Sequence, residues 1–451
     1  MSVEALLTHP AVRSLAALVE RSPWAGSVWL VGGCVRDALL GRTLGSDFDL
    51  VLEGDALALA AWLGENGATG LAVFPRFGTA GVNLNQARFE FVAARQETYD
   101  PTSRKPFVEL GTLTDDALRR DFTCNTLMVN LNDGRLLDLL KVGRQDLNDH
   151  ILRTPREPRQ TLFDDPLRML RAVRFRHQLG FSYEMGLENA LRHEAQRLQA
   201  ISAERIRDEF CKLVRWPLAL QDLMDFGLMQ FIAPELIELQ GVEQGKWHHL
   251  DVWHHTLLVI ENAASDDLIL NLACLFHDVG KPSTRCVDAR GETRFFSHEV
   301  VGANMVSTIL RRLRFNNDTI DAVSTLVKNH MRLSTASNLS TPAARRLMRD
   351  LNGQLDRLLA LVDADAKALR PGVKTLDVQA IRQRLEEVAA ETPAEKIRVP
   401  ITGEDVMEIL GIGPGPRVGE VLHLLLEQVI EGQLGPDDKD KAREMVRRFA
   451  E

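Results

Sequence analysis

The spacing of apolar residues changes once along the chain, near residue 160, and this change constrains the fold more than any other feature. Before it, short apolar or alternating runs are divided by Gly, Asn and Pro, which is typical of strands. These runs predict helices near residues 35–41 and 55–66 and strands at 28–34, 47–53, 71–74, 78–84, 87–95 and 127–131. After it, stretches such as LRMLRAVRF and VLHLLLEQVI repeat every third or fourth residue, as helices do. The predicted fold class is α+β, with a small mixed sheet in an N-terminal head followed by an all-α neck, body and tail.

Domain boundaries are expected where Pro, Gly and polar residues cluster, in NDHILRTPREPRQ, PELIELQGVEQGKWHHL and AETPAEKIRVPIT. With 451 residues, the chain is long enough to bury several cores. The predicted domains are 1–148, 149–233, 234–390 and 391–451.

Composition restricts the setting. Charged residues interrupt the apolar runs before the ~20 residues that a membrane span needs, and MSVEALLTHP lacks an export signal, so no membrane partner is expected. Five cysteines without CxxC pairing argue against a disulfide framework or a zinc knuckle, and we expect a cytoplasmic protein. A net charge of -9 argues against indiscriminate binding of nucleic acid, but it leaves room for a local basic face.

The stretch LVGGCVRDALLGRTLGSDFDL reads as strand, turn, helix, turn and strand. The missing side chains of Gly32 and Gly33 let backbone N–H groups approach a phosphate at the start of the helix. Asp47 and Asp49 project from one face of a strand and repel each other unless a cation such as Mg²⁺ lies between them. A DxD sequence alone more often marks a solvated strand end. The glycine pair and Glu90, a third carboxylate on a nearby strand, favour the metal site.

Two further motifs carry charges suited to nucleotides. The RRD motif is predicted at a helix start, where Arg120 could bind triphosphate oxygens and Asp121 could accept from a ribose hydroxyl. The alternative is an exposed turn with Asp121 as N-cap. In FDDPLRML, Pro166 suits the first helical turn and Asp165 suits the cap. Asp165 and Arg168 then lie three residues apart at one helix end, which by itself predicts an ordinary cap with an ion pair.

The order of these motifs resembles a known family. VGGCVRDALLGR and SDFDLV are similar to the signature of the nucleotidyltransferase superfamily, in particular its bacterial tRNA nucleotidyltransferase and poly(A) polymerase branch. RFGTAGV, ARQETY, GTLTDDALRRDFTCNTL, LFDDPLRMLRAVRF and SAERIRDEF follow in the order of that branch, so the likeness covers roughly the first half of the chain.

The resemblance implies template-independent addition or repair of the 3′-terminal CCA of tRNA, with CTP and ATP as substrates. Asp47 and Asp49 would hold two Mg²⁺ ions, supported by Glu90. The implied nucleotide-binding residues are Gly32, Gly33, Arg36, Asp37, Arg120, Asp121, Asn125, Asp165, Arg168, Arg171 and Arg174. Among them Asp165 and Arg168 would read the base edge in place of a template. The family generally has Glu where this chain has Asp164, a position that would orient Arg168.

The second half resembles the HD domain, a helical phosphohydrolase fold whose His, His-Asp and Asp ligands converge on a divalent cation. On the spacing of DVWHHT, HDVGKP and ALVDADAKAL, the implied ligands are His255, His277, Asp278 and Asp365. The resemblance does not identify the metal. Of the other histidines, we interpret two as supporting or phosphate-binding groups, His298 and His330, and three as structural or solvated, His248, His249 and His254.

Two segments and two alternative functions complete the interpretation. Residues 95–114 are predicted to be a mobile element that links nucleotide selection to turnover, and the absence of a large deletion there favours an enzyme that adds A.

The tail resembles a tRNA-contacting region through GIGPGP and KDKAREMVRR, although a solvated helix pair is the alternative. The alternative functions are a poly(A) polymerase of the same branch and an HD phosphohydrolase whose head only binds.

Overall fold

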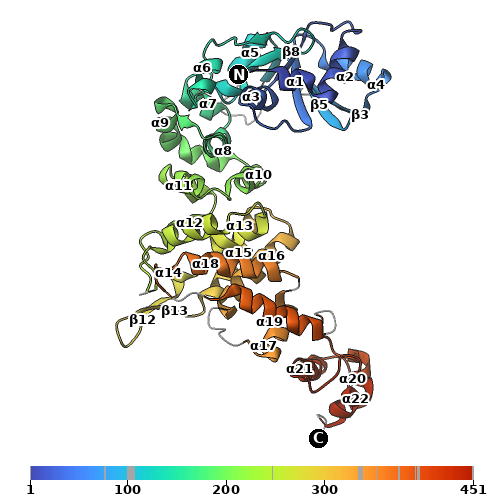
Figure 1. Ribbon diagram of the computed structural model, residues 1–451, viewed down its shortest axis with the longest axis vertical. Helices are drawn as coiled ribbons and strands as arrows, with labels where there is room; N and C mark the ends of the chain where they lie inside the picture. Colours follow the sequence, from blue (N-terminus) through green and yellow to red (C-terminus); the bar gives the residue numbers. More distant parts are fainter. Residues whose placement is uncertain are drawn as a thin grey trace. The chain divides into compact units, whose positions relative to one another are not determined.

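The computed structural model describes residues 2–75, 78–98, 107–245, 247–333, 339–351, 353–373, 376–391, 393 and 397–448. They form two compact units (Figure 1). The first contains the residues up to Glu209 together with Asp222–Phe231, and the second contains Phe210–Gln221 together with the residues from Ile232 onward. The finer division into four domains stays a prediction. Among helices of the described residues, none has the length and apolar character that a membrane crossing requires.

The first unit is built on one seven-stranded sheet in the order β3-β4-β5-β2-β1-β8-β9. The sheet is mixed, because β2 runs parallel to β5 while the other neighbours are antiparallel. Its strands are β1 (Val28–Val31), β2 (Asp47–Leu52), β3 (Thr69–Phe74), β4 (Thr79–Leu84), β5 (Ala87–Ala93), β8 (Met128–Asn130) and β9 (Leu136–Leu137). Every strand that the sequence predicted in this region is present, and the α+β class is confirmed.

The alternation of strand β2 fixes the orientation of the paired aspartates. Phe48 and Leu50 are buried, whereas Asp47 and Asp49 are exposed, as a side-chain period of two requires. Phe48 stacks on Phe89 of β5 with ring centroids 5.3 Å apart. This buried pair pins the register of the two central strands, so the carboxylates cannot slip to the other face.

The helices of the first unit surround this sheet and continue beyond it, and α10 and α11 cross the boundary between the units. They are α1 (Glu4–Thr8), α2 (Pro10–Val19), α3 (Gly33–Leu39), α4 (Ala56–Glu65), α5 (Leu113–Arg119), α6 (Gly143–Asn148), α7 (Pro158–Asp164), α8 (Arg168–Leu179), α9 (Met185–Glu194), α10 (Ala203–Leu213) and α11 (Pro217–Asp225). Strand β6 (Arg95–Thr98) pairs with β7 (Phe107–Leu110), so two paired strands lie within the predicted mobile segment, residues 95–114. Its residues 99–106 lie outside the described part, and its mobility stays a prediction.

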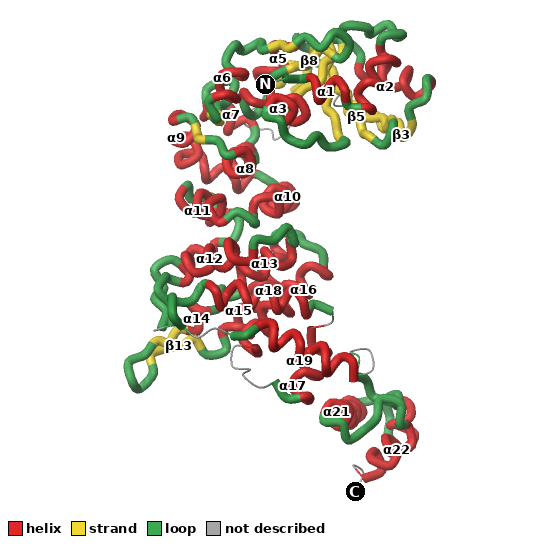
Figure 2. Tube along the Cα trace, viewed as in Figure 1, coloured by secondary structure: helices red, strands yellow, loops and turns green. Residues whose placement is uncertain are grey.

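The second unit is mainly helical (Figure 2). Its helices are α12 (Val252–Ala263), α13 (Leu268–Phe276), α14 (Lys281–Thr284), α15 (His298–Arg312), α16 (Asn317–Asn329), α17 (Thr341–Leu351), α18 (Leu355–Lys367), α19 (Val378–Glu391), α20 (Gly403–Leu410), α21 (Pro416–Ile430) and α22 (Lys439–Arg448). The last three share a small core that includes Val406, Val421 and Val446.

Two short strand pairs were not expected in the helical part of the chain. Strand β10 (Ile151–Leu152) pairs with β11 (Ser182–Tyr183) in the first unit, and β12 (Arg285–Val287) pairs with β13 (Thr293–Phe295) in the second. Strands of two or three residues are too short to show a period of two, so the apolar spacing could not reveal them.

Candidate functional sites

Three carboxylates gather on neighbouring strands of the head sheet. Asp49 of β2 lies opposite Glu90 of β5, and Asp47 follows the same face of β2. The carboxylate of Asp49 is exposed, yet nearby protein removes part of its hydration, and this desolvation with the charge of Asp47 raises its pKa against the opposing charge of Arg120. Desolvation and the charge of Asp49 also raise the pKa of Glu90. Carboxylates that destabilise one another's charge in this way fit a divalent cation with oxygen ligands.

The turn between β1 and α3 brings a glycine, a carboxylate and a guanidinium into one corner. Gly32 has φ of 80°, a left-handed conformation that L side chains rarely adopt. A Cβ atom at this position would lie 3.4 Å from Asp49 Oδ2 and 3.5 Å from Arg120 Nη1. Glycine therefore leaves the space between the two charged groups open to an anionic ligand such as a phosphate.

A continuous chain of hydrogen bonds joins five of the predicted nucleotide-binding residues. Buried Arg36 donates from Nε and Nη2 to the carboxylate of Asp37, at 2.9 and 3.0 Å, and from Nη1 to Asn125 Oδ1 at 2.9 Å. Asn125 Nδ2 donates to Asp121 Oδ1 at 3.0 Å, and Arg171 Nε donates to Asp121 Oδ2 at 2.9 Å. Burial alone would raise the pKa of Asp121, but Arg171 and Asn125 outweigh it and hold this carboxyl ionised.

The last predicted arginine, Arg174, extends this chain along α8. Its Nε donates to Glu209 Oε2 at 2.7 Å, and Arg171 Nη1 lies 3.8 Å from the other oxygen of Glu209. The ring of Phe175 lies 5.0 Å from the guanidinium carbon of Arg36 and 4.1 Å from that of Arg174. Glu209 and Phe175 lie within the motifs SAERIRDEF and LRAVRF, but no role was predicted for either residue from the sequence.

The predicted base-reading residues lie together at the start of α8 without pairing to each other. Arg168 is buried and donates from Nη1 to the carbonyl of Thr161 at 3.1 Å and from Nη2 to the carbonyl of Arg119. Asp165 accepts instead from Arg205 Nη2 at 2.8 Å. The described structure therefore does not show the ion pair of the ordinary alternative, and the base-reading role stays a prediction. The Arg168 guanidinium donates to carbonyl groups in the last turns of two helices, α7 and α5, while Arg205 of α10 neutralises Asp165.

The position of the RRD motif also differs from the prediction. Helix α5 begins with a capping box, in which Thr112 and Asp115 exchange hydrogen bonds, and it ends at Arg119. Arg120 is extended, with ψ of 169°, so the motif terminates a helix instead of starting one. The sequence TLTD contained the signal that places the helix start earlier. Asp121 is buried and paired, which also excludes the exposed N-cap turn.

Two acidic residues near this motif form ion pairs with arginines that were not predicted from the sequence. Asp116 is buried and accepts from Arg119 and from Arg120 Nε, the latter at 2.8 Å. The spacings i,i+3 and i,i+4 in DALRR are typical of such pairs and could have revealed it. Asp164 accepts from Arg156 and from Gln160 Nε2 at 2.7 Å. Asp164 therefore orients Arg156 in the described structure, and its expected part in orienting Arg168 stays a prediction.

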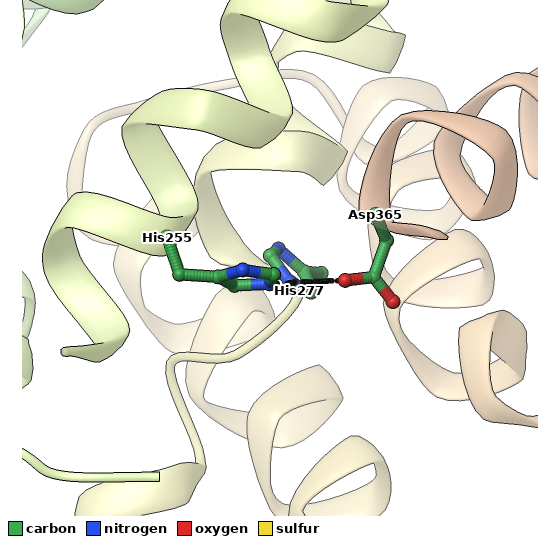
Figure 3. Close-up of side chains that lie close together, drawn as sticks. All are labelled: His255, His277 and Asp365. Carbon is green, nitrogen blue, oxygen red and sulfur yellow. Dashed lines mark hydrogen bonds and ion pairs between the residues drawn. The ribbon is translucent and has the colours of Figure 1, made fainter. Parts of the chain in front are cut away.

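In the second unit, three predicted metal ligands converge from separate segments (Figure 3). His255 comes from α12, His277 directly follows α13, and Asp365 comes from α18. His255 Nε2 lies 2.9 Å from Asp365 Oδ1, and His277 Nε2 lies 4.0 Å from the same oxygen. Their ligand atoms all lie within 4.8 Å of one another, a spacing that suits one shared cation.

A second set of ligand atoms adjoins the first. Asp278, His298 and His330 also have ligand atoms within 4.8 Å of one another, and all three are buried. Asp278 connects the two sets, because one of its oxygens lies 3.1 Å from His277 Nε2 and the other lies 3.3 Å from His298 Nε2. Lys281 Nζ lies 2.6 Å from Asp278 Oδ2. His298 and His330, which were interpreted from the sequence as supporting or phosphate-binding groups, therefore belong to the cluster itself.

Backbone carbonyl groups orient three of these histidines. Nδ1 of His277, His298 and His330 lies 2.8, 2.9 and 2.7 Å from the carbonyl oxygen three residues earlier. A carbonyl oxygen only accepts, so Nδ1 carries the proton and Nε2 presents its lone pair to the cluster. Burial and the neighbouring His277 lower the pKa of His330 to about 3 and keep it neutral. A neutral imidazole with a fixed tautomer is the form that binds metal.

The charges of the cluster favour a cation. Burial alone would lower the pKa of His277, but the negative charges of Asp278 and Asp365 outweigh it and raise this pKa, so the surrounding carboxylates favour positive charge at this position. The pKa of Asp365 is held below its usual range because hydrogen bonding to His255 and the charge of His277 outweigh its desolvation. The donor set of imidazole nitrogens and carboxylate oxygens fits zinc, iron, nickel or manganese chemistry.

Two neighbouring histidines have contacts that suit structural roles. The ring of His248 packs against that of His255 at 4.8 Å, and burial lowers the pKa of His248 to about 3. His254 Nδ1 lies 2.6 Å from the carboxylate of Asp251, the N-cap of α12. Their interpretation as structural groups stays a prediction.

A head with paired carboxylates beside a glycine turn, joined to a helical unit with a His and Asp cluster, defines a nucleotidyltransferase with an HD-type domain. Comparison with known families agrees, since the chain matches the Poly A polymerase head domain over residues 28–153 and the HD domain over residues 247–368. It also matches the probable RNA and SrmB-binding site of polymerase A over residues 180–239. These domains imply dependence on a divalent metal.

Curated relatives resemble the whole chain. An A-adding tRNA nucleotidyltransferase of Deinococcus radiodurans is 36% identical over 449 residues, which cover 95% of this chain and 97% of the relative. A CC-adding tRNA nucleotidyltransferase of Thermus thermophilus is 34% identical, covering 91% of this chain and 92% of the relative. The chain belongs to the tRNA nucleotidyltransferase family, and the resemblance inferred from its motifs is confirmed.

Solved structures of lower identity share the fold. The Bacillus stearothermophilus CCA-adding enzyme in complex with CTP is 22% identical, with a TM-score of 0.70 over 98% of both chains. The Thermotoga maritima CCA-adding enzyme complexed with tRNA is 20% identical, with a TM-score of 0.59 over 100% of this chain and 99% of that chain. These likenesses extend the agreement in fold to nearly the full length.

Proposed function

We propose that the chain adds nucleotides of the 3′-terminal CCA to tRNA in the cytoplasm, using CTP and ATP without a nucleic-acid template. The corner formed by Gly32, Asp49 and Arg120 carries this proposal, because it offers a carboxylate for metal and a guanidinium for triphosphate around an open space. The names of the relatives, A-adding and CC-adding, support the substrate class. Five free cysteines suit a reducing compartment.

Each part of the head has a defined task in the proposed reaction. Asp47 and Asp49 would hold two Mg²⁺ ions, with Glu90 beside them. When bound, Mg²⁺ supplies Lewis acidity that activates the primer 3′-hydroxyl and stabilises the departing pyrophosphate. Arg120 binds triphosphate oxygens, and Arg36 holds the glycine turn through its bonds to Asp37 and Asn125.

Base selection is assigned to Asp165 and Arg168 at the start of α8. Two carbonyl acceptors hold the Arg168 guanidinium in one place, which suits a donor that must meet ring acceptors of C and A. Asp165 keeps lone pairs beyond its bond to Arg205 and accepts from the exocyclic amine. Arg171 and Arg174 line the nucleotide site, where Arg171 also ties α8 to the head through Asp121 and Arg174 ties α8 to α10 through Glu209. The tail, residues 391–451, is proposed to contact the tRNA.

We also propose a divalent metal centre in the HD domain, with phosphohydrolase activity on a phosphate ester. The convergence of two ligand sets on Asp278 favours it, since six buried or half-buried groups surround one small volume. The proposed ligands are His255, His277, Asp278 and Asp365, joined by His298 and His330. This activity accompanies nucleotide addition and does not replace it.

Addition to defined tRNA ends tests the main proposal. Purified protein is incubated with Mg²⁺ and labelled CTP or ATP on tRNA that ends before CCA, after the first C, or after CC. We expect incorporation on at least one of these ends that stops at CC or at the completed CCA, and the pattern assigns CCA, CC or A addition. Long A tracts would instead identify a poly(A) polymerase, and nucleotide hydrolysis without incorporation would identify the HD alternative. A variant with both Asp47→Ala and Asp49→Ala serves as the inactive control.

A further inference from the structure

One buried carboxylate, Asp116 on α5, lies beneath the two arginines of the RRD motif. Its exposed fraction is 0%, and one of its oxygens accepts from Arg120 Nε at 2.8 Å while the other accepts from the guanidinium of Arg119. Burial would raise the pKa of Asp116, but the charges of Arg120 and Arg119 outweigh it and hold the pKa below its usual range. The group is therefore an anion between two cations, and the trio keeps one net positive charge.

The contact with Arg120 determines which of its nitrogens faces the head site. Nε and Nη2 of Arg120 both lie 2.8 Å from Asp116 Oδ2. Nη1 points to the corner of Gly32, where a Cβ atom would lie 3.5 Å from it. Asp116 thus fixes the planar guanidinium by one edge and leaves the other edge for the triphosphate.

The contact between Asp116 and Arg119 connects Asp116 indirectly to Arg168, the proposed base-selecting arginine. Arg119 is the last residue of α5, and its side chain is anchored on Asp116 within the same helical turn. Its carbonyl oxygen accepts from Arg168 Nη2. The position of that carbonyl sets where the Arg168 guanidinium lies, so the base-selecting group rests on a residue that Asp116 holds.

We propose that Asp116 is a positioning residue that places the triphosphate-binding Arg120 and, through Arg119, the base-selecting Arg168. The two tasks of the nucleotide site, holding the triphosphate and discriminating the base, therefore depend on one carboxylate that touches neither part of the substrate. This inference rests on the proposed function, because it assigns Arg120 and Arg168 their substrate contacts.

Asp116→Asn tests the inference, because it keeps the shape of the side chain and removes its charge. The KM for CTP and ATP should rise by about ten- to hundredfold, the range for a hydrogen bond to a charged group. Discrimination against UTP and GTP should fall in the same variant, while kcat with the correct nucleotide changes less than KM. Unchanged KM and unchanged discrimination in a folded variant would overturn the inference.

Asp222→Asn is the matched control. Asp222 is also buried in the first unit and accepts from Arg176, His177 and Tyr183, none of which belongs to the proposed nucleotide site. It should lower the melting temperature as Asp116→Asn does, yet leave KM and discrimination as in the wild type. Equal changes of KM and discrimination in both variants would reduce Asp116 to a structural role.

If Asp116→Asn does not fold, Arg119→Gln separates the effect on base discrimination from the effect on triphosphate binding. This variant should discriminate less well against UTP and GTP, because Arg168 is displaced. Its KM for CTP should stay within about twofold of the wild-type value, because Asp116 still holds Arg120. A raised KM with unchanged discrimination would contradict the inference.

Equilibrium dialysis of CTP and ATP against wild type and Asp116→Asn provides a readout without tRNA. Weaker binding by the variant supports the role of Asp116 even if wild type adds nothing to tRNA, an outcome that sinks only the proposed function. Equal binding would contradict the role.

Discussion

The head and the HD domain both gather carboxylates, but they prepare them differently for a cation. On the head, Asp47 and Asp49 are exposed acids on a strand, held by the alternation of the sheet. In the HD domain, buried histidines with fixed tautomers surround Asp278. Among the described residues, the sets of three ligand atoms that lie within 4.8 Å of one another are the two sets of the HD domain. From this difference we propose that the head centre would need substrate phosphates to complete its metal coordination, whereas the HD centre would hold a metal by itself.

The largest expected effect separates activity from folding in the head. Asp47→Ala should reduce nucleotide addition by at least about a thousandfold, because metal stabilisation of the transition state contributes several kcal/mol. The melting temperature should stay unchanged, since the variant relieves repulsion with Asp49. Single-turnover addition and thermal unfolding measure the two effects, with Glu65→Ala as an exposed acidic control. Near-normal addition by Asp47→Ala would remove these carboxylates from the mechanism.

In the HD domain, removing a carboxylate should lower stability instead of leaving it unchanged. Asp278→Ala leaves the buried ammonium group of Lys281 without its counter-ion, which should cost about 3–5 kcal/mol in the free energy of unfolding of this unit. Asp49→Ala, at an exposed position, should cost less than about 0.5 kcal/mol. Urea unfolding in a chelator measures both. Adding Lys281→Met to Asp278→Ala should recover part of the loss, and equal costs for the two single variants would refute the contrast.

Metal itself should stabilise the two centres unequally. A divalent cation at about 100 times its Kd stabilises a folded binding site by about 2.7 kcal/mol, so metal should raise the unfolding free energy of the HD unit. The head, without substrate, should gain much less. His255→Ala should abolish the gain, and His254→Ala, on the neighbouring exposed side chain, should not. Hydrogen exchange with and without metal assigns the gain to a unit, and protection confined to the head would contradict the comparison.

The smallest predicted effect concerns selectivity in the head. Arg168→Ala removes donors worth about 1.5–3 kcal/mol, so discrimination of CTP and ATP against UTP and GTP should fall by about ten- to hundredfold. A residue that only supports α8 would lower stability by about 1 kcal/mol and slow all four nucleotides equally. Rates of single-nucleotide incorporation decide between these roles. Unchanged ratios with a lowered melting temperature would assign Arg168 to structure alone.

Local patterns predicted much of this arrangement. The period of two placed Asp47 and Asp49 on one face of β2, and the apolar spacing located every predicted strand of the head sheet. The helix start at Thr112 was also readable from its capping sequence, although the prediction placed a start at the RRD motif instead.

Contacts between distant residues could not be predicted in the same way. Arg36 and Asn125 are 89 positions apart, and His255 and Asp365 are 110 positions apart. Their hydrogen bonds depend on how whole elements pack, which no local spacing encodes. The pairing of Asp165 with Arg205, which lies 40 positions away on α10, was unpredictable for the same reason, whereas local spacing could suggest only an ion pair with Arg168.

Nucleotide addition by two matched variants tests the independence of the centres most directly. Asp49→Asn and His277→Ala are each mixed with tRNA lacking CCA, Mg²⁺ and labelled nucleotide in a single turnover, and metal content and phosphate release are measured on the same preparations. Asp49→Asn should add no nucleotide while retaining the metal of the HD domain, and His277→Ala should lose that metal while adding nucleotide within about twofold of the wild-type rate. Loss of addition in a folded His277→Ala variant, or addition by Asp49→Asn, would contradict two separate centres with nucleotidyl transfer in the head.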